Sequence, residues 1–146
     1  MRKILFVCYG NICRSPMAEM ILKTLTKDIL CDSKATSTEE IGNGIYPLAK
    51  ETLKKHNILL IPHVAQQVTK EDYFFYDEIY GMDEENIISL QRIFGSDPDH
   101  KIHKLLEQED ILDPWFTRDF ETAYQCILKG CKKILEQKGE KKYAKR

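Results

Sequence analysis

A short apolar strand, followed at once by a tight polar loop and a helix start, constrains this chain more than any other feature. Ile4–Val7 is a continuous apolar run, typical of a strand buried on both faces of a parallel sheet. The loop 9–14 follows, and then Ser15 and Pro16 predict an N-cap and a proline at the first helical position. Because ligands of open α/β sheets bind beyond the carboxyl ends of the strands, this loop is a candidate binding site.

The rest of the chain alternates between strand and helix patterns. Further strands are predicted at residues 29–36 and 78–82, and further helices at 47–57, after an N-cap at Asp83, and from about Asp119. Residues 101–106 are compatible with a fourth strand or with a helical turn. This alternation predicts an α/β fold whose parallel sheet is covered by helices on both faces.

Length and charge narrow the class of protein. The 146 residues fit one domain, 1–146, and residues 138–146 read as a frayed basic tail. With 22 basic and 23 acidic residues the net charge is -1, which argues against nucleic acid as a partner. No apolar run reaches the roughly 18 residues of a membrane span, and the apolar run near Met1 is shorter than the ~7–15 residues of a signal peptide. We therefore expect a cytoplasmic protein without a membrane partner.

The cysteines argue against a metal site or a disulfide framework. There are five, an odd number, and none forms a C-x-x-C pair or a zinc-type spacing with histidine. We expect no metal and no cofactor, and at least one free thiol.

The loop after the first strand has the composition of an anion cradle. Gly10 and Asn11 tolerate the positive φ that turns successive backbone N–H groups inward. The following helix adds the positive end of its dipole, and the guanidinium of Arg14 can hold two phosphate oxygens at once. These features predict a site for a tetrahedral dianion.

Cys8 stands at the rim of this cradle. The field that binds an anion would also stabilise its thiolate, and Ser15 could add a hydroxyl hydrogen bond to the sulfur. A thiolate facing a bound phosphate is a nucleophile aimed at phosphorus. The alternative is a buried structural cysteine at the end of a strand.

Asp113 is a candidate acid for the leaving group. Pro114 restricts it to extended conformations, and Trp115 and Phe116 could wall the site and exclude water. On the local sequence alone, an ordinary turn aspartate before proline is an equally good interpretation.

Taken together, these segments resemble the low-molecular-weight protein tyrosine phosphatase family over nearly the whole chain. The matching segments are Phe6–Pro16, Asp32-Ser33, Ala35–Ser37, Glu40–Asn43, His63–Ala65, Gln67–Asp72, Met82-Asp83, Asp113–Trp115 and Asp119–Glu121. The resemblance implies a four-stranded parallel sheet and hydrolysis of phosphotyrosine proteins or small aryl phosphates, with phosphate as a product inhibitor.

The resemblance also assigns roles to residues. Cys8 would be the nucleophile, Arg14 the phosphate clamp and Asp113 the general acid and base. The phosphate-binding loop would comprise Tyr9, Gly10, Asn11, Ile12, Cys13 and Ser15. Ser33 and His63 would join Asn11 and Ser15 in a hydrogen-bond network. Without the resemblance, His63 would be interpreted as a loop or core histidine whose hydrogen bonds are satisfied.

Two positions carry further expectations from the resemblance. Cys13 would form a reversible disulfide with Cys8 that protects the nucleophile, and its alternative is a small residue packed under the loop. Glu39 stands where some members have an aromatic residue, so we expect a substrate wall of Glu39, Trp115 and Phe116 that disfavours acidic peptides. Independently of the resemblance, Cys126 and Cys131 are five residues apart on one predicted helix, which points them about 140° apart, so we expect them to pack in the core and not to pair.

Two other functions on the same pattern are less well supported. A thioredoxin-coupled arsenate reductase needs an additional cysteine pair in mid-chain, and residues 32–125 contain no cysteine. A non-catalytic phosphate or phosphopeptide sensor would not need Cys8, Arg14 and Asp113 all intact.

Overall fold

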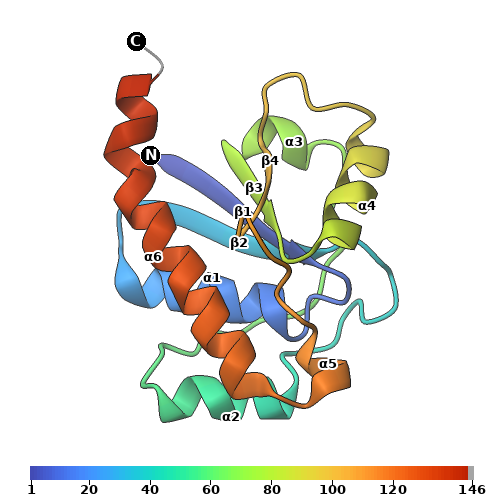
Figure 1. Ribbon diagram of the computed structural model, residues 1–146. Helices are drawn as coiled ribbons and strands as arrows, with labels where there is room; N and C mark the ends of the chain where they lie inside the picture. Colours follow the sequence, from blue (N-terminus) through green and yellow to red (C-terminus); the bar gives the residue numbers. More distant parts are fainter. Residues whose placement is uncertain (145–146) are drawn as a thin grey trace.

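Four parallel strands form one sheet in the computed structural model, which describes the backbone of residues 1–144 and the side chains of residues 1–137 (Figure 1). The strands are β1 (Arg2–Cys8), β2 (Ile29–Ala35), β3 (Glu78–Gly81) and β4 (Ile102–Lys104). Their order is β2-β1-β3-β4, so β1 lies inside the sheet with a partner on each side. The predicted parallel sheet is confirmed, and the undecided segment 101–106 contains the short strand β4.

The helices lie on both faces of the sheet, as predicted (Figure 1). They are α1 (Arg14–Leu25), α2 (Pro47–Lys55), α3 (Asp72–Phe75), α4 (Glu84–Phe94), α5 (Pro114–Thr117) and α6 (Phe120–Ala144). Helices α1, α2 and α6 cover one face, and α3 and α4 lie on the other. The predicted tail, 138–146, falls on the end of α6, where side chains and the last two residues are outside the described part of the chain.

The apolar run in β1 supplies both hydrophobic cores. Ile4 and Phe6 pack toward α1 and α6, whereas Leu5 and Val7 pack toward α4, and none of the four side chains is exposed. Burial of each such side chain contributes about 1.5–3 kcal/mol. The strand that carries Cys8 at its end is therefore anchored on both faces, and this fixes where the loop begins.

Helix α1 begins at Arg14, so Ser15 is not the N-cap that the sequence predicted. Cys13 occupies the N-cap position without a side-chain hydrogen bond to the helix. The hydroxyl of Ser15 instead lies 3.0 Å from the Cys8 sulfur. The loop curls tightly enough to bring the first helical turn under the cysteine, and Ser15 serves that contact rather than capping.

Among residues 1–144, no helix combines the length and apolar character needed to cross a membrane.

Candidate active site

A cavity of about 180 Å³ opens beyond the carboxyl end of β1. Its lining residues are Cys8, Tyr9, Gly10, Asn11, Ile12, Cys13, Arg14, Glu39, Glu40, Asp113, Trp115 and Phe116. The structure thus brings the predicted loop, the predicted acid and the predicted walls to one place. Ser15, Ser33 and His63 lie behind the loop, and Glu40 is a wall residue that sequence reasoning missed. Within the described side chains, no group of three or more His, Cys, Asp or Glu residues could hold a metal ion.

The loop curls around the sulfur of Cys8. Asn11 has φ of 60°, a left-handed conformation that asparagine tolerates better than most residues. This turn points the backbone N–H of Asn11 at the sulfur, 3.3 Å away, and the N–H of Ser15 lies 3.4 Å from the same atom. Cys8 is 3 % exposed. Its sulfur therefore faces the start of α1 and two backbone donors, which favour a negative charge there.

A buried network includes the hydroxyl group of Ser15 that contacts the Cys8 sulfur. The side-chain amide of Asn11 donates to the hydroxyls of Ser15 (2.8 Å) and Ser33 (3.0 Å). Because the Ser15 oxygen already accepts this bond, its own proton is available for the Cys8 sulfur. The predicted grouping of Asn11, Ser15 and Ser33 is present, and His63 joins it through a 2.8 Å contact between Nε2 and the Asn11 carbonyl oxygen.

Glu19 ends this network and was not anticipated from the sequence. The hydroxyl of Ser33 donates to Glu19 Oε1 at 2.7 Å, and Lys23 donates to Glu19 Oε2 at 2.6 Å. Glu19 is 7 % exposed, and both of its carboxylate oxygens have a hydrogen-bond partner. Its spacing of four residues from Lys23, on the same helix, was the signal available in the sequence.

Arg14 lines the cavity and is held by groups distant in sequence. Its Nη1 donates to Asp83 Oδ2 (2.7 Å) and to the carbonyl oxygen of Ile111 (2.8 Å), and its Nη2 lies 3.5 Å from Asp113 Oδ2. Burial alone would lower the pKa of the Arg14 guanidinium, but Cys8 and the two carboxylates raise it above its ordinary value. The guanidinium is a permanent positive charge beside the Cys8 sulfur.

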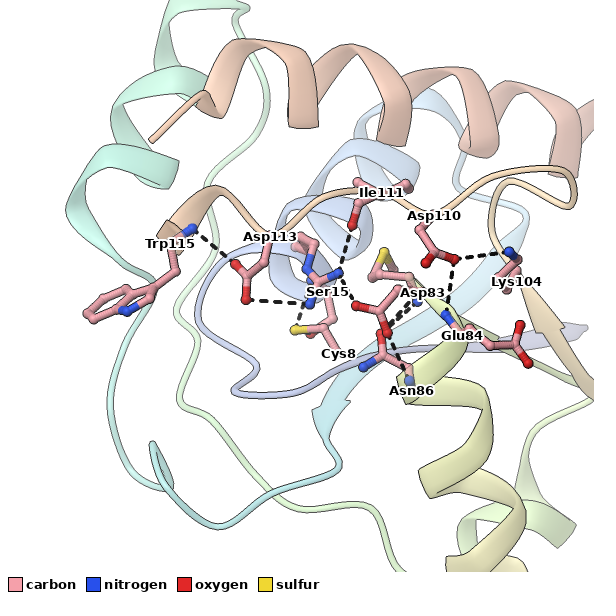
Figure 2. Close-up of polar contacts among 12 residues, drawn as sticks. Cys8, Ser15, Asp83, Glu84, Asn86, Lys104, Asp110, Ile111, Asp113 and Trp115 are labelled. Atoms are coloured by element: carbon pink, nitrogen blue, oxygen red, sulfur yellow. Dashed lines mark hydrogen bonds and ion pairs between the residues drawn. The ribbon is translucent and has the colours of Figure 1, made fainter. Parts of the chain in front are cut away.

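Asp83 has a second partner at the start of α4. Its Oδ1 accepts the backbone N–H of Asn86 at 2.8 Å in a full capping box, while Oδ2 accepts from Arg14 (Figure 2). The predicted N-cap is confirmed. The contact with Arg14 was missed, because a capping pattern reports only local hydrogen bonds.

Asp113 caps the short helix α5. Its Oδ1 accepts the backbone N–H of Trp115 at 3.0 Å (Figure 2). Pro114 occupies the first helical position. The side chain is 25 % exposed, and Oδ2 remains on the cavity side near Arg14. Capping fixes the carboxyl group in orientation while leaving one oxygen available to a ligand.

The mouth of the cavity combines aromatic and acidic groups. Trp115 and Phe116, which line it, are 43 % and 79 % exposed. Glu39 and Tyr9 also line it, and the hydroxyl of Tyr9 donates to Glu39.

All five cysteines are free thiols, and the four other than Cys8 differ in how deeply they are buried. Burial raises the pKa of the Cys13 thiol well above its usual range, and Cys8 adds to the effect, so Cys13 stays protonated near neutral pH. Cys131 is fully buried and Cys126 is partly buried against the same core, as predicted. Burial raises the pKa of Cys31 to about 12.

Comparisons with known proteins identify the family. The family model of low molecular weight phosphotyrosine protein phosphatases matches residues 3–144. The chain is 40% identical over 151 residues to such a phosphatase of Gallus gallus, covering 93% of this chain and 95% of that protein. The chain belongs to this family, and it is accordingly an enzyme of the protein tyrosine phosphatase class.

Solved structures agree with this assignment. The low molecular weight protein tyrosine phosphatase of Streptococcus pyogenes superposes with a TM-score of 0.91 at 38% identity, covering 100% of this chain and 99% of that one. Vibrio vulnificus Wzb in complex with benzylphosphonate superposes with a TM-score of 0.86 at 30% identity, covering 93% and 98%.

Proposed function

We propose that this enzyme hydrolyses phosphotyrosine and other aryl phosphates through a cysteinyl-phosphate intermediate. The observation that carries the proposal is that the Cys8 sulfur, the Arg14 guanidinium and the Asp113 carboxyl group meet at one cavity. Benzylphosphonate in the related Wzb structure supports an aryl substrate, since it places a ring one carbon from a phosphorus group. The positive field of the loop, the start of α1 and Arg14 would bind the dianion.

In the first step, the Cys8 thiolate attacks phosphorus in line with the leaving oxygen. Arg14 and the loop N–H groups bind the equatorial oxygens, where negative charge is held in the transition state. The S–P bond forms, the P–O bond breaks, and Asp113 gives its proton to the departing phenolate. The pKa of a tyrosine hydroxyl is about 10, so an unprotonated phenolate is a poor leaving group at neutral pH.

In the second step, water hydrolyses the cysteinyl phosphate. The Asp113 carboxylate accepts a proton from the water as its oxygen attacks phosphorus, and the S–P bond breaks to regenerate the Cys8 thiolate. Inorganic phosphate is released from the same cradle, so it should act as a competitive product inhibitor.

A rapid-quench experiment tests the mechanism directly. Mixing the enzyme with radiolabelled p-nitrophenyl phosphate should give a burst of nitrophenol and acid-stable label on Cys8, identified by peptide mapping. Label on another residue, or turnover without any protein-bound phosphate, contradicts the proposed intermediate.

Glu39 is expected to set a charge preference among phosphopeptides. Its carboxylate lies at the rim, and a like charge on the peptide about 4 Å away costs on the order of 1 kcal/mol in water. Glu39→Gln should therefore raise kcat/KM for a phosphotyrosine peptide with acidic flanks by about fivefold at low salt, and less at high salt.

Basic-flanked peptides should show the opposite change, and Glu51→Gln on the outer face of α2 is the matched control. If the ranking of acidic and basic peptides is the same in Glu39→Gln as in the unaltered enzyme, Glu39 does not select substrates. Glu39→Trp tests the aromatic alternative in the same panel.

We also propose that Cys13 protects Cys8 from irreversible oxidation. Hydrogen peroxide oxidises the Cys8 thiolate to a sulfenic acid, and the Cys13 thiol attacks it, forming the disulfide and releasing water. Dithiothreitol then restores both thiols. Peroxide-treated enzyme should recover most of its activity with dithiothreitol, whereas Cys13→Ser should recover little of its own starting activity.

Cys126→Ser is the control, because this thiol is half-buried on α6 and should leave recovery unchanged. Equal recovery of activity by the Cys13→Ser variant, or the absence of a Cys8–Cys13 disulfide by mass spectrometry, contradicts the protective role of Cys13.

A catalytic thiol with four other free cysteines suits a reducing compartment, and we propose the cytoplasm as the location.

A further inference from the structure

Helix α2 begins without a side-chain cap, and the residue at its N-cap is an aromatic one. Tyr46 occupies this position, and its side chain makes no hydrogen bond to the helix. Serine, threonine, aspartate and asparagine are the residues that normally stabilise such a start. The side chain of Tyr46 is used elsewhere.

The ring of Tyr46 packs against the segment that follows the candidate acid. It meets Trp115 edge to face at a centroid distance of 4.9 Å, and it stacks on Phe120 at 5.8 Å. Figure 1 shows α5 beside the N-terminal end of α2, where these contacts lie. The aromatic contacts therefore join α2, α5 and the start of α6.

Arg118 closes this aromatic group. Its Nη2 donates to the hydroxyl of Tyr46 at 2.9 Å, and its Nη1 donates to the carbonyl oxygen of Trp115 at 3.1 Å. The guanidinium carbon lies 5.4 Å, 5.9 Å and 5.6 Å from the ring centroids of Tyr46, Trp115 and Phe120, within the range of cation–π attraction. Arg118 has φ of 62°, a left-handed conformation that arginine seldom adopts, so these contacts hold it there.

Tyr46 also contacts the phosphate-binding loop through its backbone. Its N–H donates to the carbonyl oxygen of Ile12 at 2.8 Å. One residue thus binds the loop that carries the nucleophile and, through its ring and hydroxyl, the helix that Asp113 caps.

We propose that Tyr46 and Arg118 are positioning residues that set the distance between the Asp113 carboxyl group and the phosphate held by the loop. This inference rests on the proposed function, because it gives Asp113 the role of general acid. Proton transfer requires the acid within about 2.6–3.2 Å of the leaving oxygen, and Asp113 is 25 % exposed in a four-residue helix that has little stability of its own. The contacts of Tyr46 and Arg118 supply the missing restraint.

Comparing two leaving groups tests this inference. Phenol is a poor leaving group that needs the acid, whereas nitrophenol is a good one that needs it much less. In Arg118→Ala and Tyr46→Ala, kcat/KM for phenyl phosphate should fall about tenfold, whereas kcat/KM for p-nitrophenyl phosphate should fall less than about threefold. Tyr46→Phe keeps the ring, so its kcat/KM for phenyl phosphate should fall much less than that of Tyr46→Ala.

The double variant adds a further criterion. Both residues act through the same contact. The kcat/KM for phenyl phosphate of the variant that combines Tyr46→Ala with Arg118→Ala should therefore be only slightly lower than that of either single variant. Lys101→Ala is the matched control, since it removes a cation 4.9 Å from the Tyr73 ring and a bond to a carbonyl at the opposite end of the sheet. Lys101→Ala should leave kcat/KM unchanged for both esters. Equal losses for both esters in the Arg118→Ala variant would indicate a merely structural role and overturn the inference.

The only tryptophan of the chain gives a readout that does not depend on activity. Trp115 lies in α5, so its fluorescence anisotropy and acrylamide quenching report the restraint directly. Arg118→Ala should lower the anisotropy and raise the quenching constant in protein shown by circular dichroism to be folded. Unchanged Trp115 mobility overturns the inference. If the unaltered enzyme hydrolyses neither ester, the proposed function fails, and this measurement alone decides whether the restraint exists.

Discussion

A Cys8→Ser variant is expected to lose phosphatase activity by at least about 10⁴-fold, because a serine hydroxyl at this site remains protonated and cannot attack phosphorus. The substitution changes one atom at a side chain that is 3 % exposed, and the Ser15 and Asn11 contacts can persist with oxygen. The fold and the anion cradle should therefore survive. Steady-state rates with p-nitrophenyl phosphate measure the loss.

Phosphate binding separates loss of the nucleophile from loss of the site. Isothermal titration with inorganic phosphate should give an affinity for Cys8→Ser within a few-fold of that of the unaltered enzyme. The control is Cys126→Ser, which should retain full activity. Substantial turnover by a freshly prepared Cys8→Ser variant would remove Cys8 from the mechanism.

Asp113→Asn is expected to lower kcat/KM for phenyl phosphate by about 10²–10⁴-fold, since the amide has no proton to give to the leaving oxygen. The loss for p-nitrophenyl phosphate should be much smaller, because nitrophenolate departs without full protonation. The amide oxygen can still accept the Trp115 N–H, so the cap of α5 is retained. A series of aryl phosphates with increasing leaving-group pKa measures the change in slope.

Asp110→Asn is the matched control, three residues earlier in the same segment. Asp110 accepts from the Glu84 N–H at 3.1 Å and from Lys104 at 3.0 Å (Figure 2), and it is not among the residues that line the cavity. It should leave the slope unchanged. If Asp113→Asn loses the same factor for every leaving group, Asp113 is not the acid.

The sequence alone was sufficient for the parts of the fold and site that are local. The continuous apolar run Ile4–Val7 predicted an interior strand, and all four side chains are buried. Gly10 and Asn11 predicted a curled loop with positive φ, and of the two only Asn11 has a positive φ. Residues 101–106 stayed undecided because three residues of edge strand carry too little pattern to separate them from a helical turn.

The features of the site that the local sequence did not predict depend on contacts between distant segments. Asp113 was indistinguishable from a turn residue, because its place beside Arg14 arises only when the β4–α5 connection folds over α1. The sequence indicated the cap at Asp83 but not its ion pair with Arg14. Ser15 was predicted both as an N-cap and as a hydrogen-bond partner of Cys8, and only the second role is present.

Asp83 restricts any attempt to improve this enzyme, because each of its two carboxylate oxygens has a separate partner. One oxygen secures the first turn of α4, and the other holds the guanidinium under the substrate cavity. A library selected for heat resistance and a library selected for faster turnover would both be barred from this position, since either gain would be traded against the other. Improvement must therefore come from residues that do not join two such contacts in one side chain.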